Sequence, residues 1–376
     1  MKPLEGLLVV AIEQAVAAPL CSARLVQAGA RVIKIEREEG DFARGYDKAA
    51  KGESSYFIWL NQGKESICLD FKSDEGAELL WSILKKADVL IQNLSPGALS
   101  RSGFSTQALH SINPKLIVCN ISGYGMEGEA SRKPAYDLLV QAESGLISVS
   151  GSPDAPGRIG VSVCDIGAGM TAYSGVLEAV LKRSITGKGD EISISLFDVA
   201  ADWMAVPFIH AEYGEGAPKP VGLRHPSIAP YGAFECSDRK LVLISIQNER
   251  EWERLCKKAL GSEDLFKNGN YTSNNLRVSN RDQLEIDMTD LTSKFTSAEL
   301  QSKLQETGIA YGALNEASDL ATHKAFSKAE YQTAKGDSVM LSAHPVKWLD
   351  EAENNAMRTP EIGEHTKSIT EEFSAL

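Results

Sequence analysis

Apolar segments of strand length alternate with helix-like segments along the first part of the chain. The expected strands lie at 7–12, 31–35, 89–91 and 116–119, and the expected helices begin near 15 and 73. Strands that are apolar throughout are typical of a parallel sheet with helices on both faces. The sequence therefore predicts an α/β fold built on a parallel sheet.

Glycines and prolines gather at 214–230 and interrupt this alternation, as expected of a linker or a domain crossing. A segment of mixed α and β character follows, with a hairpin expected around Ser237 and Asp238. The tail that remains is too short for a domain and is expected to pack back on the first one. The predicted parts are 1–205, a small domain with its linkers at 206–325, and a return at 326–376.

The 376 residues carry a net charge of −12, which argues against general binding to nucleic acid or to anionic membranes. No apolar stretch approaches the length that a membrane-spanning helix needs. The six cysteines contain no Cys-x-x-Cys motif and are expected to be reduced thiols in a cytoplasmic protein. The six histidines show no ligand spacing, so no metal site is expected.

Polar and basic residues follow the expected strands, although the protein as a whole is acidic. Ligands of open parallel sheets bind beyond the carboxyl ends of the strands, so these residues form a candidate site for a phosphorylated ligand. Surface arginines and lysines that are merely solvated are the competing interpretation. The residues concerned are Glu13, Gln14, Glu36, Arg37, Asp41, Arg44, Asn61, Lys64, Asn93, Ser95 and Arg101.

The segment 123–128 matches the G-x-G-x-x-G pattern of dinucleotide-binding proteins and follows an expected strand. In such proteins a helix begins at the glycines and its amides bind the pyrophosphate. Here Pro134 and the charged residues before it disfavour a helix. We therefore expect neither NAD nor FAD.

Asp137 stands between this glycine segment and an apolar run. An aspartate at the start of a helix is more often an N-cap than a catalyst. A carboxylate can also attack an activated acyl group and hold it covalently, and nearby glycine backbone can approach a developing oxyanion closely. The chain has no G-x-S-x-G motif, and no histidine lies next to Cys21, Cys119 or Cys164. Both interpretations of Asp137 stay open at this point.

Several segments together resemble the class III CoA-transferases, which include formyl-CoA transferase and carnitine CoA-transferase. The resemblance covers essentially the whole chain. It rests on 25–36, 40–45, 61–67, 93–99, 122–125, 134–137 and 360–366. It implies a large domain of Rossmann-like topology, a smaller inserted domain, and two chains that interlock as rings in a homodimer.

The resemblance also implies the chemistry of the site. Asp137 matches the family's catalytic aspartate, which attacks a donor thioester and then carries CoA as an aspartyl-CoA thioester, without metal or ATP. Arg37 matches a residue near the CoA adenine. The positions that match the CoA groove are Asn61, Lys64, Asn93, Leu94, Ser95, Arg101 and Tyr124.

Two features bear on the substrate. Val16 stands where formyl-CoA transferases carry a glutamine, which puts formyl and oxalate chemistry in doubt. The segment 224–231 resembles the branch that acts on short dicarboxylates such as mesaconate, citramalate and itaconate. The resulting prediction is transfer from an acyl-CoA such as succinyl-CoA to a short dicarboxylic acid, with Arg224 or His225 pairing with the distal carboxylate.

Two rivals remain. An α-methylacyl-CoA racemase shares the fold but carries a histidine before the aspartate, where this chain has Tyr136; Asp165 matches the second carboxylate of such racemases. A non-catalytic acyl-CoA-binding protein with the same fold is the other rival.

Overall fold

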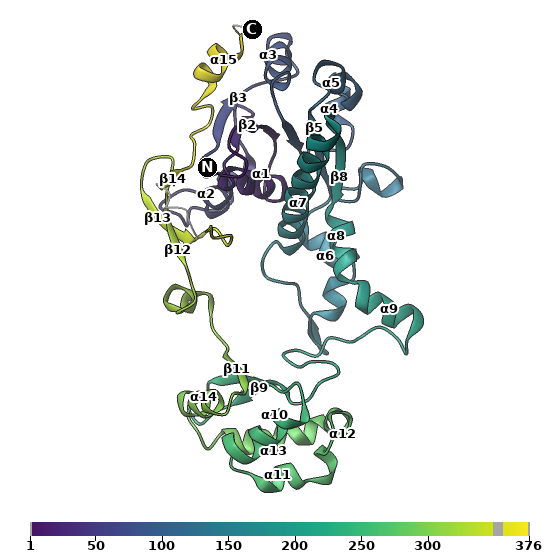
Figure 1. Ribbon diagram of the computed structural model, residues 1–376, viewed down its shortest axis with the longest axis vertical. Coiled ribbons are helices and arrows are strands. Elements are labelled where there is room, and N and C mark those ends of the chain that lie inside the picture. The colour runs from purple at the N-terminus through teal and green to yellow at the C-terminus, as the bar shows by residue number, and fades with distance from the viewer. Residues whose placement is uncertain (1, 349–355, 375–376) are drawn as a thin grey trace. The chain divides into compact units, whose positions relative to one another are not determined.

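The computed structural model describes residues 2–348 and 356–374, and the chain divides into two compact units (Figure 1). The first unit comprises Met1–Ile147, Arg158–Ile209 and Ser327–Leu376, and the second comprises Ser148–Gly157 and His210–Phe326. The short segment 148–157, which forms a hairpin of β6 (Gly151–Ser152) and β7 (Ala155–Pro156), groups with the second unit. Nothing in the sequence had linked it to the inserted part.

The first unit is built on a six-stranded sheet in the order β3-β2-β1-β4-β5-β8, and every neighbouring pair is parallel. Its strands are β1 (Leu8–Ile12), β2 (Arg31–Glu36), β3 (Glu65–Cys68), β4 (Val89–Gln92), β5 (Ile117–Ser122) and β8 (Glu191–Ser195). The prediction of an α/β fold with a parallel sheet is confirmed. The strand order reverses between β1 and β4, and open sheets of this kind bind ligands at that point.

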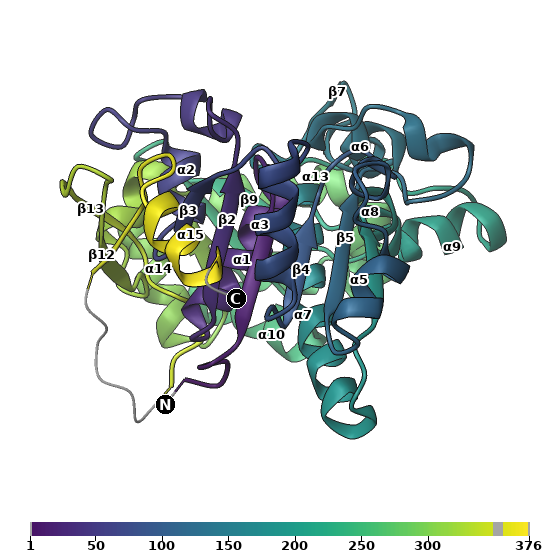
Figure 2. The same cartoon turned by 90° about the horizontal axis from the view of Figure 1, so that it is seen from above.

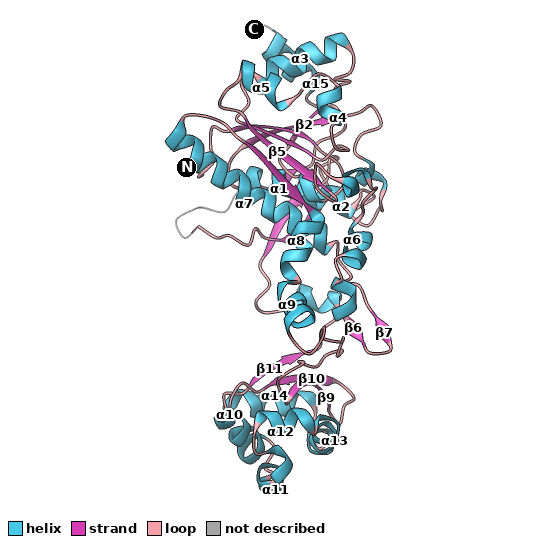
Figure 3. Cartoon of the chain, turned by 90° about the vertical axis from the view of Figure 1, so that its right-hand side faces the viewer, coloured by secondary structure: helices cyan, strands magenta, loops and turns pink. Residues whose placement is uncertain are grey.

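Helices cover both faces of the sheet, which explains why its strands are apolar throughout (Figure 3). One face packs on α1 (Ala17–Gln27) and α7 (Val163–Thr186). These two helices approach closely at Gly169, where a Cβ atom would lie 2.5 Å from the carbonyl oxygen of Ala17. The other face packs on α3 (Asp74–Leu84), α5 (Thr106–Ile112) and the C-terminal α15 (Thr366–Ser374).

The C-terminal residues return to the first unit (Figure 2). The backbone of His365 donates to the Ser66 carbonyl at 2.9 Å, which fixes the chain beside β3. Ile369 and Phe373 of α15 then enter the core. Before them, β12 (Lys328–Gln332), β13 (Ser338–Ser342) and β14 (Met357–Arg358) form a small sheet.

The second unit has its own core between an antiparallel sheet and helices. The sheet contains β9 (Tyr231–Glu235), β10 (Leu241–Ser245) and β11 (Ala310–Ala313), with the predicted hairpin between the first two. The helices are α10 (Glu249–Arg254), α11 (Glu263–Lys267), α12 (Asn274–Ser279), α13 (Arg281–Thr292) and α14 (Ser297–Glu306). The sequence places the start of α14 through the capping box of Thr296 and Glu299, which the structure contains.

No helix among the described residues combines the length and the apolar character that crossing a bilayer requires. Within the same residues, no group of three or more histidine, cysteine or acidic side chains could hold a metal ion. All six cysteines are free thiols, and Cys68 is the one that is not fully buried.

Candidate functional site

Two pockets open at the carboxyl ends of the strands in the first unit. The larger has a volume of about 940 Å³ and lies beyond β1, β2 and β3. The smaller has a volume of about 550 Å³ and is lined by Asp137 and Asp165, with Val16, Tyr46 and Tyr136 around them. The two pockets therefore sit where the strand order predicts a ligand site.

Asp137 is the first residue of α6 (Asp137–Glu143), and its side chain is only 8% exposed. Its Oδ1 accepts hydrogen bonds from the backbone N–H groups of Cys164, at 2.8 Å, and Asp165, at 3.3 Å. These donors belong to the first turn of α7, whose own N-cap residue, Ser162, makes no side-chain cap. Asp137 is thus a helix cap, but for α7 rather than for its own helix.

Gln141 secures this arrangement from one turn further along α6. Its Nε2 donates to Oδ2 of Asp137 at 2.7 Å, and its Oε1 accepts from the backbone N–H of Ile159 at 2.9 Å. Both carboxylate oxygens of Asp137 are therefore engaged. These hydrogen bonds hold the carboxylate in place and occupy acceptor sites on both of its oxygens.

Asp165 lies in the first turn of α7 and lines the same pocket. In the described part of the chain no donor bonds to its carboxylate oxygens, whereas its backbone N–H belongs to the cap described above. Burial, together with the negative charge of Asp137, raises the pKa of Asp165 to about 7. A carboxylate with a raised pKa, open to a pocket, is a candidate catalytic group.

The positions predicted for the CoA groove separate into three groups. Arg37, Leu94, Ser95 and Arg101 line the larger pocket. Asn93 and the predicted substrate residue Val16 line the smaller one.

The third group comprises Tyr124, Asn61 and Lys64, and none of the three lines either pocket. Tyr124 packs against the hydrophobic core beside Phe197, with the Lys133 ammonium 5.4 Å from its ring centre. The prediction that Asn61 and Lys64 belong to the CoA groove stays a prediction. Their side chains are buried and are joined to a network of ion pairs, three acids of which line the larger pocket.

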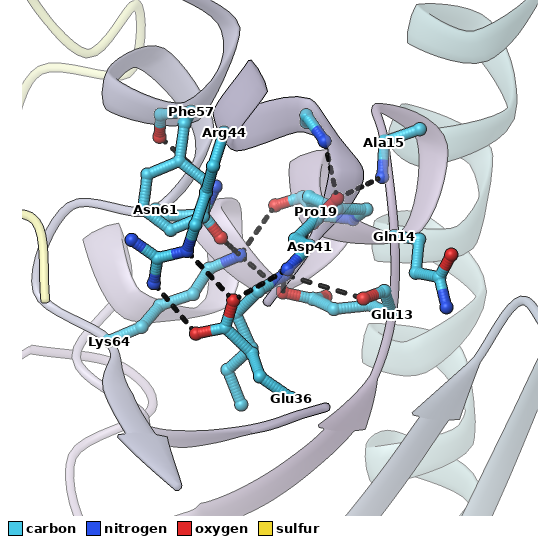
Figure 4. A network of polar contacts seen from close by, with 12 residues as sticks. Glu13, Gln14, Ala15, Pro19, Glu36, Asp41, Arg44, Phe57, Asn61 and Lys64 are labelled. Atoms are coloured by element: carbon cyan, nitrogen blue, oxygen red, sulfur yellow. Dashed lines mark hydrogen bonds and ion pairs between the residues drawn. The ribbon is translucent and has the colours of Figure 1, made fainter. Parts of the chain in front are cut away.

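Figure 4 shows this network, which we call the Glu13 network. It contains three acids and three bases: Glu13, Glu36, Asp41, Lys34, Arg44 and Lys64. Glu13 lies at its centre, 2.6 Å from the ammonium of Lys64 and 3.3 Å from that of Lys34, and all three side chains are fully buried. Equal numbers of both charges allow the network to be buried without a net charge.

The Glu13 network also sets protonation and backbone geometry. Although burial opposes it, the Lys64 and Lys34 ammonium groups lower the pKa of Glu13 to about 2. Burial lowers the pKa of Lys64 to about 8 against the attraction of Glu13. Asp41 accepts from Lys34 at 2.9 Å and, through its other oxygen, from the backbone N–H of Ala15 at 3.1 Å. The network thereby holds the loop after β1, which forms a wall of the smaller pocket.

Arg224 and His225 belong to the second unit. The Arg224 guanidinium forms ion pairs with Asp282 and Glu285 of α13. The His225 ring stacks on Tyr231 with ring centres 5.3 Å apart, and its Nδ1 accepts from the backbone N–H of Ser227 at 3.2 Å. Arg224 is therefore already paired with carboxylates of this chain, whereas the Nε2 of His225 makes no hydrogen bond with the described residues.

Sequence reasoning gave Asp165 only the role of a racemase carboxylate, and it missed the aromatic side chains of the smaller pocket. Phe42, Tyr46 and Tyr56 line it and contact one another, with ring centres 5.7 and 5.4 Å apart. They come from loop and helix starts with no periodic pattern. Asp137 and Asp165 are 28 residues apart, so no local sequence pattern indicates that they line the same pocket.

Comparison with known proteins gives a consistent result. Residues 4–366 match CoA-transferase family III. The chain is 32% identical to an acetyl-CoA:oxalate CoA-transferase of Acetobacter aceti, over 99% of this chain and 96% of that one. It is 31% identical to the succinyl-CoA:glutarate CoA-transferase of Mus musculus, over 99% and 86%. It is 27% identical to the succinyl-CoA:mesaconate CoA-transferase of Haloarcula hispanica, over 99% and 96%.

Solved structures agree with this result. A CAIB/BAIF family protein from Brucella suis superposes with a TM-score of 0.87 and 30% identity, covering 99% of both chains. A hypothetical protein from Mycobacterium tuberculosis gives a TM-score of 0.87 at 25% identity, covering 98% of this chain and 99% of that one.

The Glu13 network makes a stability prediction. Lys64→Met should lower the free energy of unfolding by about 3 kcal/mol or more, because it leaves part of the Glu13 charge buried and unpaired. Denaturant titration followed by circular dichroism measures the change. Lys182→Met is the matched control, since Lys182 pairs with Asp190 at the surface and should change stability by no more than about 1 kcal/mol. Equal effects of the two substitutions would contradict the proposed importance of the network.

Proposed function

The chain belongs to CoA-transferase family III and is a CoA-transferase, and from this premise we propose that it transfers CoA from succinyl-CoA to a short dicarboxylic acid. Mesaconate, citramalate, itaconate and glutarate are the proposed acceptors. The observation that carries the proposal is the pair of carboxylates, Asp137 and Asp165, in a small pocket that shares Gln14 with a larger pocket lined by charged side chains of both signs. Relatives that are named as transferases acting on glutarate and mesaconate support the substrate class.

The larger pocket suits the nucleotide part of CoA. Arg37, Lys72 and Arg101 line it and provide positive charge for phosphates. Six acidic residues line it as well, and three of them, Glu13, Glu36 and Asp41, are paired with bases of the Glu13 network. Phe71 and Leu94 provide apolar surface for a base. Its volume of about 940 Å³ lies within the range of sites for ligands of this size. We therefore assign CoA phosphates and adenine to this pocket and the acyl group to the smaller one.

We assign the nucleophile to Asp165 rather than to Asp137, the residue indicated by the sequence. Asp137 has both oxygens engaged in hydrogen bonds and is nearly inaccessible. The Asp165 side chain lines the pocket, no donor among the described residues bonds to its carboxylate, and burial and the charge of Asp137 destabilise its ionised form. A destabilised carboxylate gains more than a stabilised one when it forms a bond to an acyl carbon.

The reaction then proceeds in four balanced steps. The Asp165 carboxylate attacks the donor thioester carbonyl, and CoA thiolate leaves as a mixed anhydride forms. The thiolate attacks the aspartyl carbonyl, which gives aspartyl-CoA thioester and releases the donor acid. The acceptor carboxylate displaces CoA thiolate to form a second anhydride. Attack of the thiolate on the acceptor carbonyl yields the new acyl-CoA and restores the Asp165 carboxylate.

Two predicted substrate residues differ in how well the structure supports them. Arg224 is paired with Asp282 and Glu285, so it is a weaker candidate for binding a dicarboxylate. The Nε2 of His225 has no hydrogen-bond partner within 2–348 and 356–374. Its Nδ1 accepts a hydrogen bond, which leaves Nε2 as the protonated donor in the neutral ring. We retain His225 as the proposed ligand of the distal carboxylate and Val16 as a small apolar wall of the acyl pocket.

A panel of acceptors tests both substrate and nucleophile. Wild-type protein incubated with succinyl-CoA and single carboxylic acids should produce a new acyl-CoA with C4–C5 dicarboxylates, detected by mass spectrometry.

Hydroxylamine added during turnover should modify Asp165, because an anhydride or thioester there reacts with it. Asp165→Ala should lose at least about 10³-fold in kcat and show no modification. His225→Ala should raise KM for dicarboxylates and leave monocarboxylates unaffected.

Other outcomes of this experiment separate the rivals. Modification at Asp137 with full labelling in Asp165→Ala would refute the assignment of the nucleophile. Loss of the α-proton of a 2-methylacyl-CoA in deuterated water, without transfer, would indicate a racemase. Binding of CoA without either reaction would indicate a non-catalytic acyl-CoA-binding protein.

The raised pKa of Asp165 predicts the pH dependence of the reaction. The nucleophile must be ionised, so kcat/KM should fall as the pH decreases through about 7, to about one tenth of its plateau at pH 6. Asp137→Asn removes the like charge, and the pKa of Asp165 and the acid limb should move to lower pH. The carboxamide oxygen can still accept from the Cys164 N–H.

A substitution on the same helix controls for the charge change. Glu143 lies at the end of α6 and pairs with Lys133 at the surface, so Glu143→Gln should leave the acid limb in place. An acid limb that does not move in Asp137→Asn would show that Asp137 does not control the protonation of the nucleophile.

We also propose that the protein acts as an interlocked homodimer in the cytoplasm. The helix α9 (Ala205–Tyr213) has no buried residue. Its large apolar side chains are each more than half exposed: Val206, Phe208, Ile209 and Tyr213. A helix with this much exposed apolar surface needs a partner surface, which a second copy would supply. The free cysteines support a reducing compartment.

Sedimentation equilibrium tests this assembly. At micromolar concentration the wild type should have about twice the mass of the 40.7 kDa chain. Phe208→Glu combined with Ile209→Glu should shift the mass toward the monomer, because charges disfavour burial of α9. A monomeric wild type would rule the dimer out.

A further inference from the structure

Gln14 lies where the two pockets of the first unit adjoin. Among the residues that the structure describes, it is the one that lines both the larger and the smaller pocket. It directly follows Glu13, yet the two side chains diverge: Figure 4 shows Glu13 directed toward Lys64 and Gln14 directed away from the Glu13 network. Gln14 therefore lies at the boundary that the two pockets share.

The backbone of Gln14 is held on both sides. Asn93, at the end of β4, accepts from the Gln14 N–H at 2.9 Å and donates to the Gln14 carbonyl at 2.8 Å. The next residue, Ala15, donates its N–H to Asp41. The position is thus fixed by both strands that flank the reversal of strand order.

Ala15 has a φ of +66°, which is unfavourable for a residue with a Cβ atom. Such a conformation persists when surrounding contacts determine it, here through the bonds of Asn93 and Asp41 to this loop. The turn at Ala15 leads the chain from Gln14 directly into α1, whose first residue also lines the smaller pocket.

The side-chain amide of Gln14 takes no part in this clamp. No hydrogen bond joins it to another group in the described residues, while the backbone around it is fully bonded. A primary amide offers two donors and an acceptor, which is complementary to another amide. A well-ordered backbone that presents an unbonded amide at the junction of two pockets is suited to bind a ligand there.

We propose that the Gln14 carboxamide binds an amide of the pantetheine arm of CoA where the arm passes from the nucleotide pocket to the acyl pocket. This proposal rests on the proposed function, because CoA is the ligand that joins a phosphorylated nucleotide to a thioester through a chain with two amide groups. Gln14 is then a positioning residue: it fixes how far the thioester reaches toward Asp165.

Calorimetric titration of the full chain tests the proposal with two probes. Gln14→Leu keeps a similar volume but cannot hydrogen-bond, and it should raise the Kd of CoA about fivefold. The Kd of adenosine 3′,5′-bisphosphate, which lacks the arm, should stay unchanged. Gln14→Ala should give the same pattern, and Gln107→Leu on α5, an exposed glutamine outside both pockets, should change neither Kd.

The outcomes distinguish this proposal from the one on which it rests. If wild type transfers CoA but Gln14→Leu keeps wild-type affinity for CoA, or weakens both probes equally, the role of Gln14 is refuted and the proposed function stands. If wild type binds neither probe and transfers nothing, the proposed function fails and this proposal fails with it.

Discussion

The carboxylate of Glu13, shared by the ammonium groups of Lys34 and Lys64, determines the geometry on which both pockets depend. Glu13 follows the last residue of β1 and is buried as a charged group. The surrounding acids and bases give the buried cluster no net charge. Asp41 extends the same network to the backbone of Ala15, so the buried ion pairs fix the loop that follows β1. Removing one charge from such a network costs more than the pair itself contributes, because its partners stay buried.

The two aspartates of the smaller pocket have different environments, although both are close to the first turn of α7. The first turn of α7 has unpaired N–H groups, and Asp137 satisfies two of them from another helix. Asp165, in that same turn, receives no such bond on its side chain and lies near the first charge. The contacts that stabilise one carboxylate therefore place the other in a less favourable state, which suits a nucleophile.

The sequence was sufficient for the elements whose signal is local. Apolar strands, the capping box at Thr296 and the hairpin before β10 each depend on a few neighbouring residues. Burial of Lys64 could not be predicted, because lysine is rarely buried and its partner Glu13 lies 51 residues away. Asp137 was recognised as a cap or a catalyst, but the helix that it caps begins in a distant segment.

The same limit explains why Gln14 drew no attention as a single residue. Its importance comes from the side chain being unbonded while its backbone is bonded on both sides, and neither property has a sequence pattern. Other charged residues near the pockets have partners within the protein: Glu13 forms ion pairs with two lysines, and Asp137 accepts hydrogen bonds from amide groups. In the proposed mechanism, a CoA-transferase needs a carboxylate that can attack the acyl carbon. We propose Asp165 for this role, because it lines the pocket and its carboxylate is destabilised by burial and by the charge of Asp137.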